Sequence, residues 1–350
     1  MKKTLLRTTS LAALAMAISA TPASAKFEVG ISGYMEQWFG YSDNSNSANP
    51  DSDVFDENSD IVIAVGFSQE LDNGLEIGGE VGFIGTGGGG IDSQLLYVEG
   101  SFGQLNLGTG DDAATAMHFG VISNGIGLDD GDAATVWVAG AAGPLSITST
   151  TSNVDNTSNK VTYFSPRMNG VQLGVSYIPE IGDTDARVPA TGGLENNTFR
   201  DNSVSVGANY ENTFDAMSFK VSVGYADGGT DLSAIGSEDA LSAGVQLGFG
   251  GFTASFAYGE HDRDDGTPQN VNTFGASLAY NAGPAGVSLA YLRGEDSPSD
   301  DKQDAIEVGA NIEIGPGITA STSLYYVERV TAGSTTADGV AVVGGLTLTF

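Results

Sequence analysis

The sequence has no cysteine, few basic residues and no long apolar run beyond its start. Without cysteine the chain forms no disulfide and needs another source of stability. Thirteen Lys and Arg stand against 44 Asp and Glu, a formal net charge of −31. This charge excludes a general affinity for nucleic acid or for anionic lipid headgroups. After residue 25 no run of 18 apolar residues occurs, so a transmembrane helix is excluded as well.

The first 25 residues have the pattern of a cleaved export signal. Three basic residues precede a short apolar run at residues 11–20, and Ala-Ser-Ala ending at Ala25 fits a small-residue cleavage site. The apolar run is too short for a membrane anchor. We expect cleavage after Ala25 and a mature chain of residues 26–350, whose net charge falls from −31 to −34 because three basic residues are lost.

Alternation with a period of two runs through most of the mature chain. Residues 252–259 (FTASFAYG) place Phe, Ala, Phe and Tyr on one face and Thr, Ser, Ala and Gly on the other. The same pattern recurs at residues 217–225, 273–280 and 306–314. One apolar face and one small or polar face indicate half-buried β-strands.

Two classes of all-β protein fit such strands, a soluble sandwich and a membrane barrel. The segments are about ten residues or longer and many are joined by very short turns, as in membrane barrels. Tyrosines near segment ends fit an aromatic girdle; they include Tyr41, Tyr177, Tyr210, Tyr225, Tyr258, Tyr280 and Tyr291. The second face carries Gly, Ser, Ala and Thr, where a soluble sandwich would present Lys and Glu to water. The pattern favours a transmembrane β-barrel.

Counting the segments gives sixteen antiparallel strands. They are expected near residues 27–41, 59–71, 75–86, 91–100, 102–109, 160–166, 171–179, 199–210, 216–226, 239–249, 252–262, 271–281, 286–294, 304–314, 318–329 and 340–350. Residues 135–139 and 145–149 also alternate, and as wall strands they would raise the count to eighteen. We place them inside a long loop instead.

That loop, residues 110–159, is the longest connection between predicted strands. A connection of this length in a compact domain is usually functional. It begins with Asp111 and Asp112, becomes apolar and Gly-rich, and turns acidic again at Asp129. We predict that it folds into the barrel and narrows the pore.

The segments on either side of the loop, EGSFGQLNLG (residues 99–108) and NKVTYFSPRMNGVQLG (residues 159–174), and the final Phe350 carry a resemblance to a known family. The chain resembles the general diffusion porins of Gram-negative outer membranes, in particular the alphaproteobacterial type. The resemblance implies a homotrimer of sixteen-stranded barrels in outer-membrane lipid, each with its third external loop folded inward as an eyelet. It also implies that the outer-membrane assembly machinery reads Phe350.

In each predicted strand, every second side chain is expected to point into the lumen, opposite the apolar face. The family's eyelet sets acidic loop residues against basic residues on the opposite wall, but only ten basic residues remain in the mature chain. Carboxylates in a narrow pore favour cations, so we predict a weakly cation-selective pore for the passive diffusion of small hydrophilic solutes and ions. The candidate constriction and selectivity residues are Asp111, Asp112, Asp129, Asp130, Asp132, Lys160, Lys220, Arg329, Glu76 and Glu80.

Three other classes of protein fit the sequence less well than a general pore. A hydrolase needs a nucleophile with a base in reach, and the two His lie far apart in sequence, so no enzyme is expected. A substrate-specific channel is the main alternative, although few aromatic residues fall on the inward positions, and a structural or adhesive barrel is the other. No cofactor is expected. Acidic loop clusters, such as Asp51 to Glu57 or Asp262 to Asp265, could hold Ca²⁺, but none has the spacing of an EF-hand, and solvated loop carboxylates explain them better.

Overall fold

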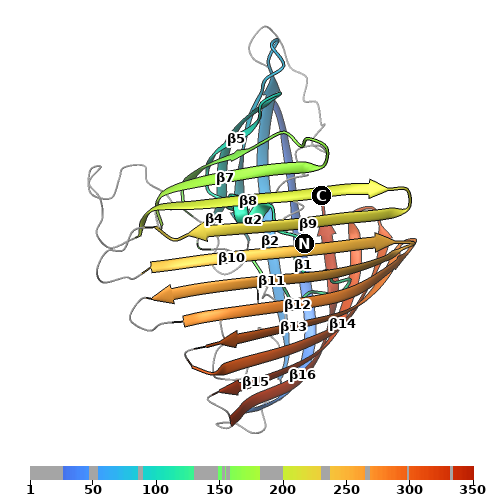
Figure 1. The fold of residues 1–350 in the computed structure, drawn as a ribbon. Coiled ribbons are helices and arrows are strands. Elements are labelled where there is room, and N and C mark those ends of the chain that lie inside the picture. The colour runs from blue at the N-terminus through green and yellow to red at the C-terminus, as the bar shows by residue number, and fades with distance from the viewer. Residues whose placement is uncertain are drawn as a thin grey trace.

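The computed structural model describes residues 27–46, 54–85, 90–129, 149–151, 154, 158–181, 200–229, 237–264, 269–297, 299–331 and 334–350. Within these residues, sixteen antiparallel strands form one closed barrel, in which consecutive strands pair and β16 pairs with β1 (Figure 1). The strands are β1 (Glu28–Asn46), β2 (Val54–Glu70), β3 (Glu76–Ile84), β4 (Gly90–Gly100), β5 (Gly103–Gly108), β6 (Lys160–Phe164), β7 (Val171–Glu180), β8 (Asp201–Phe214), β9 (Met217–Asp227), β10 (Ser237–Phe249), β11 (Phe252–Asp264), β12 (Gln269–Ala282), β13 (Ala285–Asp296), β14 (Asp301–Gly315), β15 (Ile318–Thr331) and β16 (Ser334–Thr349). The prediction of an all-β, sixteen-stranded antiparallel barrel is confirmed.

Several strands extend further than the apolar alternation predicted. β1 continues to Asn46, β8 to Phe214, and β16 begins at Ser334. These extensions consist largely of polar residues whose backbones still pair with the neighbouring strand, as Asn46 does with Ala337. Hydrophobic patterning ends where apolar burial ends, whereas the hydrogen-bonded ladder continues beyond it.

The barrel has its apolar residues outside and its small and polar residues inside. On β11, Phe252 and Phe256 are 50% and 52% exposed on the outer face, while Ser255 and Ala257 are buried on the inner face. The same alternation holds on the neighbouring strands, where Leu247 and Leu278 point outward. Among the described residues, no helix is long and apolar enough to cross a membrane.

The last residue closes the barrel. The N–H of Gly33 donates to the carbonyl of Phe350 at 2.9 Å, and the N–H of Phe350 donates to the carbonyl of Gly33 at 3.1 Å. From there the register between β1 and β16 runs from Tyr34 opposite Thr349 to Asn46 opposite Ala337. Closure therefore pairs the backbone of both terminal strands and leaves no free sheet edge.

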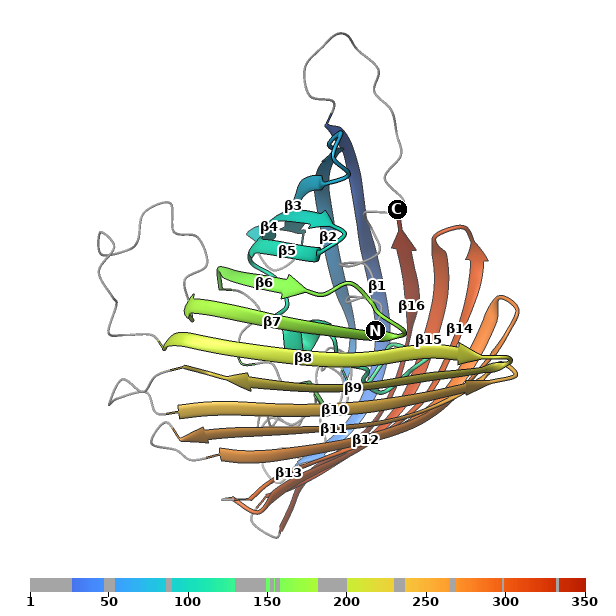
Figure 2. The same ribbon diagram turned by 45° about the horizontal axis from the view of Figure 1, so that its top comes forward.

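The two ends of the barrel differ in the length of their connections. At one end, here called the turn end, β10 and β11 join through Gly250 and Gly251, whose φ angles of +57° and +87° suit a tight hairpin turn. At the other end, here called the loop end, β5 ends at Gly108 and β6 begins at Lys160, so the long connection lies where the sequence predicted it. Figure 2 shows β5 and β6 as short strands beside the long ones, with six and five residues.

Candidate pore constriction

The connection between β5 and β6 folds into the barrel along its described part. It begins with a one-turn helix, α2 (Ala113–Ala116), which contacts the wall at β6 to β9. Residues 119–127 then continue along the wall as far as β15, where the N–H of Ile126 meets Ser323. We call residues 109–129 the seated loop. Its path along successive strands narrows the lumen from one side.

A row of polar side chains on the inner wall holds the backbone of the seated loop. The hydroxyls of Ser176, Ser205 and Ser222 accept the N–H groups of Ala113, Ala114 and Phe119 at 2.8, 2.9 and 2.9 Å. Ser255 and Ser277 share the N–H of Ile122, each at 3.1 Å. Ser288 and Ser323 accept those of Asn124 and Ile126, each at 2.8 Å. We call these seven residues, one from each of β7, β8, β9, β11, β12, β13 and β15, the serine row.

The two strands that the serine row skips contribute longer polar side chains. From β10, the amide of Gln246 donates to the carbonyl of Gly120 at 3.0 Å. From β14, the carboxylate of Glu307 accepts the N–H of Gly127 at 3.0 Å and the hydroxyl of Ser323 at 2.6 Å. The loop thus bonds to every strand from β7 to β15. Each such hydrogen bond contributes about 1 kcal/mol net, and the buried N–H groups would be costly without partners.

Glycines on the wall let the loop backbone come this close. A Cβ at Gly244 would lie 2.0 Å from the carbonyl oxygen of Phe119, and one at Gly309 would lie 2.4 Å from the nitrogen of Gly125. Both distances are shorter than any non-bonded contact allows. The small Gly and Ser residues at the inward positions therefore make room for the loop backbone. This explains their presence in addition to the crowding of the inner wall.

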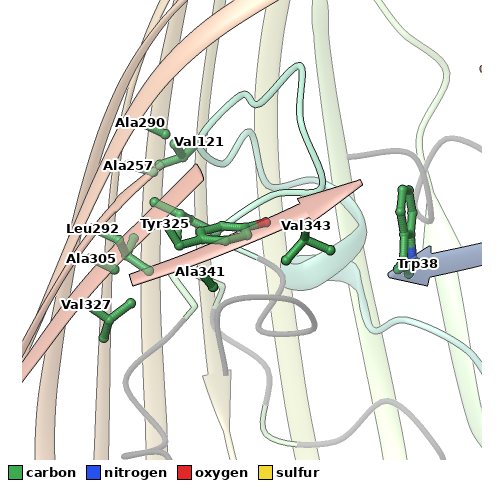
Figure 3. Close-up of a cluster of buried hydrophobic side chains, with 11 residues drawn as sticks. Trp38, Val121, Ala257, Ala290, Leu292, Ala305, Tyr325, Val327, Ala341 and Val343 are labelled. Carbon is green, nitrogen blue, oxygen red and sulfur yellow. The ribbon is translucent and has the colours of Figure 1, made fainter. Parts of the chain in front are cut away.

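An apolar cluster covers the far part of the seated loop. Val121 and Leu128 of the loop pack with wall residues that include Leu292 and Tyr325. Figure 3 shows Val121 beside Ala257 and Ala290, with Tyr325 in the middle of the cluster. The hydroxyl of Tyr325 donates to the carbonyl of Gly127 at 3.1 Å. The cluster also includes Trp38 of β1, so β1 reaches the level of the loop.

Asp112 lies beneath the loop rather than at its surface. Its side chain is fully buried, caps α2 by accepting the N–H of Thr115 at 3.0 Å, and accepts the hydroxyl of Ser205 at 2.8 Å. Burial raises the pKa of this carboxyl above its ordinary value. A carboxylate without contact with solvent positions the loop, and it does not present charge to passing ions as the sequence analysis predicted.

Asp129 joins the two described ends of the loop. Its carboxylate accepts the N–H of Val121 at 2.7 Å and the N–H of Thr150 at 2.8 Å. The hydroxyl of Thr150 also donates to it, and His118 Nε2 lies 2.9 Å from that hydroxyl. Burial raises the pKa of Asp129 to about 6. Asp129 is therefore a bridging residue, and its hydrogen bonds are satisfied within the loop.

The predicted basic residues of the lumen are all paired. Lys160 is buried and its Nζ donates to the carbonyl of Gly110 at 2.6 Å. Lys220 Nζ lies 3.4 Å from Glu211 and 5.2 Å from the ring centroid of Phe119. Arg329 is 3.7 Å from the carboxylate of Asp301. Lys220 and Arg329 thus each have a carboxylate nearby, whereas Lys160 is buried beneath the start of the loop.

The remaining predicted residues are spread along the barrel. Glu76 accepts the hydroxyl of Tyr97 at 2.6 Å at the turn end of β3. Glu80 lies four residues further along the inner face of that strand, and Asp111 is half-buried at the start of the seated loop. Asp130, Asp132 and Ala25 lie outside the described residues. Those of the predicted residues that the structure describes are therefore not gathered into one ring.

A second polar cluster lies on the inner wall at the loop end. The buried carboxylate of Glu238 pairs with Arg200, with His261 at 2.5 Å and with Arg263 at 3.4 Å. No group of three or more His, Asp or Glu side chains in the described part of the chain is arranged to hold a metal ion. Of the acidic clusters considered for Ca²⁺, Asp51, Asp53 and Asp265 lie outside that part.

One of the missed roles had a signal in the sequence. Asp112 is followed by Ala-Ala-Thr, and an Asp ahead of helix-favouring residues is a common helix N-cap. The serine row had a weaker signal, because Ser222, Ser255 and Ser277 fall on inward positions. Nothing in the sequence connects these serines with the loop, since Ser323 is 197 positions from its partner Ile126.

Comparison with known proteins agrees with this architecture. The family model described as Gram-negative porin matches residues 10–332. The anion-selective porin from Comamonas acidovorans is 15% identical, with a TM-score of 0.64 over 93% of this chain and 100% of its own. OmpT of Vibrio cholerae is 13% identical, with a TM-score of 0.60 over 95% and 100%. A mutant of the Rh. blastica porin is 14% identical, with a TM-score of 0.56 over 92% and 100%.

No curated protein sequence matches the chain. At these identities the structural matches show the fold, and the family model shows the family. The chain belongs to the Gram-negative porins, non-enzymatic channel-forming β-barrels of the outer membrane.

Proposed function

We propose that this porin is a weakly cation-selective channel for the passive diffusion of small hydrophilic solutes and ions. The observation that carries the proposal is an asymmetry of charge. Between Lys26 and Lys160 the sequence contains 20 Asp and Glu and no Lys or Arg. This stretch forms β1 to β5 and the long loop. Carboxylates that line a pore without basic partners on the same wall raise the local concentration of cations.

The contacts of the basic residues also support a preference for cations. On the wall from β6 to β15, Lys160 is buried, and Lys220 and Arg329 each lie beside a carboxylate. At the loop end, Glu238 lies beside both Arg200 and Arg263, so its carboxylate offsets only part of their positive charge. The Comamonas porin of similar fold is named as anion-selective. Selectivity therefore has to be argued from the side chains of this chain, because the barrel is shared.

Three further parts of the proposal rest on the family. We infer that residues 1–25 are removed on export, that Phe350 is recognised by the outer-membrane assembly machinery, and that the mature chain forms a homotrimer. A trimer form is named for OmpT of Vibrio cholerae. The segments EGSFGQLNLG and NKVTYFSPRMNGVQLG support placing the chain with the alphaproteobacterial porins.

Solute uptake into proteoliposomes tests the general function. With the mature chain reconstituted, osmotic swelling should slow smoothly as neutral sugars become larger. Choline should enter faster than a monovalent organic anion of similar size. Saturable preference for one sugar would favour a substrate-specific channel, and faster entry of the anion would overturn the cation preference.

A further inference from the structure

We propose that Lys220 on β9 admits small anions at the constriction and thereby keeps the cation selectivity of the pore weak. This inference rests on the proposed cation-selective channel and assigns its weakness to one residue. The acidic stretch before Lys160 explains a preference for cations, but it does not explain why that preference should be weak. A positive charge beside the constriction limits the preference if passing ions can reach it.

Lys220 lies against the seated loop, on its turn-end side. It is two residues from Ser222 on the inner face of β9, and the hydroxyl of Ser222 accepts the N–H of Phe119 at 2.9 Å. The Nζ atom of Lys220 lies 5.2 Å from the centroid of the Phe119 ring, within the range of a cation–π contact. The ammonium group is therefore held at the edge of the loop that narrows the lumen.

The side chain of Lys220 is also in contact with solvent. It is 37% exposed, whereas the side chain of Arg329 is 15% exposed and Lys160 is buried. Of the three basic residues predicted for the lumen, Lys220 is thus the one that both contacts the seated loop and remains open to water. The ring of Phe119 is neutral, so the contact with it orients the ammonium group without cancelling its charge.

The carboxylate beside Lys220 is shared with a second cation. Glu211 on β8 is opposite Lys220 in the register, and its Oε2 lies 3.4 Å from Lys220 Nζ. The Oε1 of Glu211 lies 3.2 Å from Nε of Arg167, in the turn between β6 and β7. On its other side, Lys220 is opposite the neutral Gln246 of β10. Two cations against one carboxylate leave this cluster with a positive charge that is not balanced within it.

A single charge within reach of the ions has a measurable effect. A unit charge about 5 Å from a monovalent ion in water changes the local concentration of that ion about fourfold. At about 0.1 M salt, where the Debye length is about 10 Å, screening reduces the change to about twofold. Lys220 thus raises the concentration of anions, and lowers that of cations, where the seated loop narrows the lumen.

The experiment changes the charge at this position alone. K220Q removes the charge and keeps a long polar side chain, whereas K220R keeps the charge. The control, R293Q, removes a positive charge from the outer face of β13, where Arg293 is 38% exposed and also lies beside carboxylates. Each protein is reconstituted in a planar bilayer, and the zero-current potential is measured across a tenfold KCl gradient at low ionic strength.

We expect the permeability ratio of K⁺ to Cl⁻ to rise at least about twofold in K220Q, by the Coulomb argument above. K220R and R293Q should keep the wild-type ratio. An unchanged ratio in K220Q, or an equal rise in R293Q, would overturn the assignment while leaving a cation-selective wild type in place. An anion-selective wild type would instead contradict the proposed function, and the shift between wild type and K220Q would still report on Lys220 separately.

K220C makes the test independent of folding. Because the chain has no cysteine, this variant carries a single thiol, which is modified after the channel has inserted and opened. Aminoethyl methanethiosulfonate adds a positive charge and should lower the ratio of K⁺ to Cl⁻ permeability, whereas the neutral ethyl methanethiosulfonate should leave it unchanged. Equal effects of the two reagents, or no effect of either, would show that ions do not meet the charge at this position.

Discussion

At the residue scale, identical side chains acquire different roles according to what surrounds them. Asp111, Asp112 and Asp129 are equivalent in the sequence as acids of one loop. In the structure, Asp112 caps α2 and Asp129 bridges Val121 and Thr150. A carboxylate that accepts several N–H and O–H groups organises backbone, whereas one in contact with water acts on ions through its charge.

The environment of Asp129 leads to a prediction about how the stability of the fold depends on pH. Burial raises its pKa to about 6, so the folded protein binds this proton more tightly than the unfolded chain does. Protonation of Asp129 therefore stabilises the fold, with a gain that begins as the pH falls through 6 and is complete near the unfolded value of about 4. Relative to D129N, the wild type should gain thermal stability between pH 7 and pH 4.

Thermal unfolding of both proteins in detergent checks this at several pH values. Taking the difference between wild type and variant removes the contribution of the other carboxylates, to the extent that they titrate alike. Replacement of the exposed Asp72, in the turn between β2 and β3, serves as the control for the loss of a carboxylate outside the seated loop. A pH-independent difference for D129N would mean that Asp129 is not the titrating group.

At the scale of elements, the seated loop forms hydrogen bonds to nine successive strands of the wall, β7 to β15. The wall strands follow from period-two alternation, which is a local property, so the sequence predicted all sixteen of them. The two predicted strands on either side of the long connection, which became β5 and β6, indicated where the loop starts and ends. Its path could not be predicted, because each hydrogen bond joins residues far apart in sequence, from 63 positions for Ala113 and Ser176 to 197 for Ile126 and Ser323.

The hydrogen bonds of the serine row lead to a prediction about the motion of the seated loop. S288A with S323A leaves the N–H groups of Asn124 and Ile126 without their acceptors and removes a donor to Glu307. An unsatisfied buried polar group costs about 1–3 kcal/mol, so the far part of the seated loop should detach more often. Single-channel recordings should show more current noise within the open state.

Ser321 provides the matched control. It lies two residues from Ser323 on the same buried face of β15, and its hydroxyl makes no hydrogen bond to the described residues. S321A should leave the open-channel noise at the wild-type level. Equal noise in S321A and in the double variant would show that the serine row does not hold the loop.

At the scale of the whole molecule, one barrel combines two walls of different character. The wall from β7 to β15 is occupied by the seated loop, and its basic side chains are paired. The strands β1 to β5 carry acids and no Lys or Arg. The family resemblance implied basic residues opposite the loop, and in this chain the corresponding wall has the opposite sign. A shared fold thus leaves the sign of the selectivity to a small number of side chains.

The zero-current potential of the wild-type porin across a KCl gradient tests the central claim most directly. Cations driven down the gradient faster than anions leave the concentrated side negative, and we predict this sign, with a preference that grows as the salt is diluted because screening weakens. A potential of the opposite sign would contradict the account of the acidic wall, while discrete open-channel currents would still identify a pore.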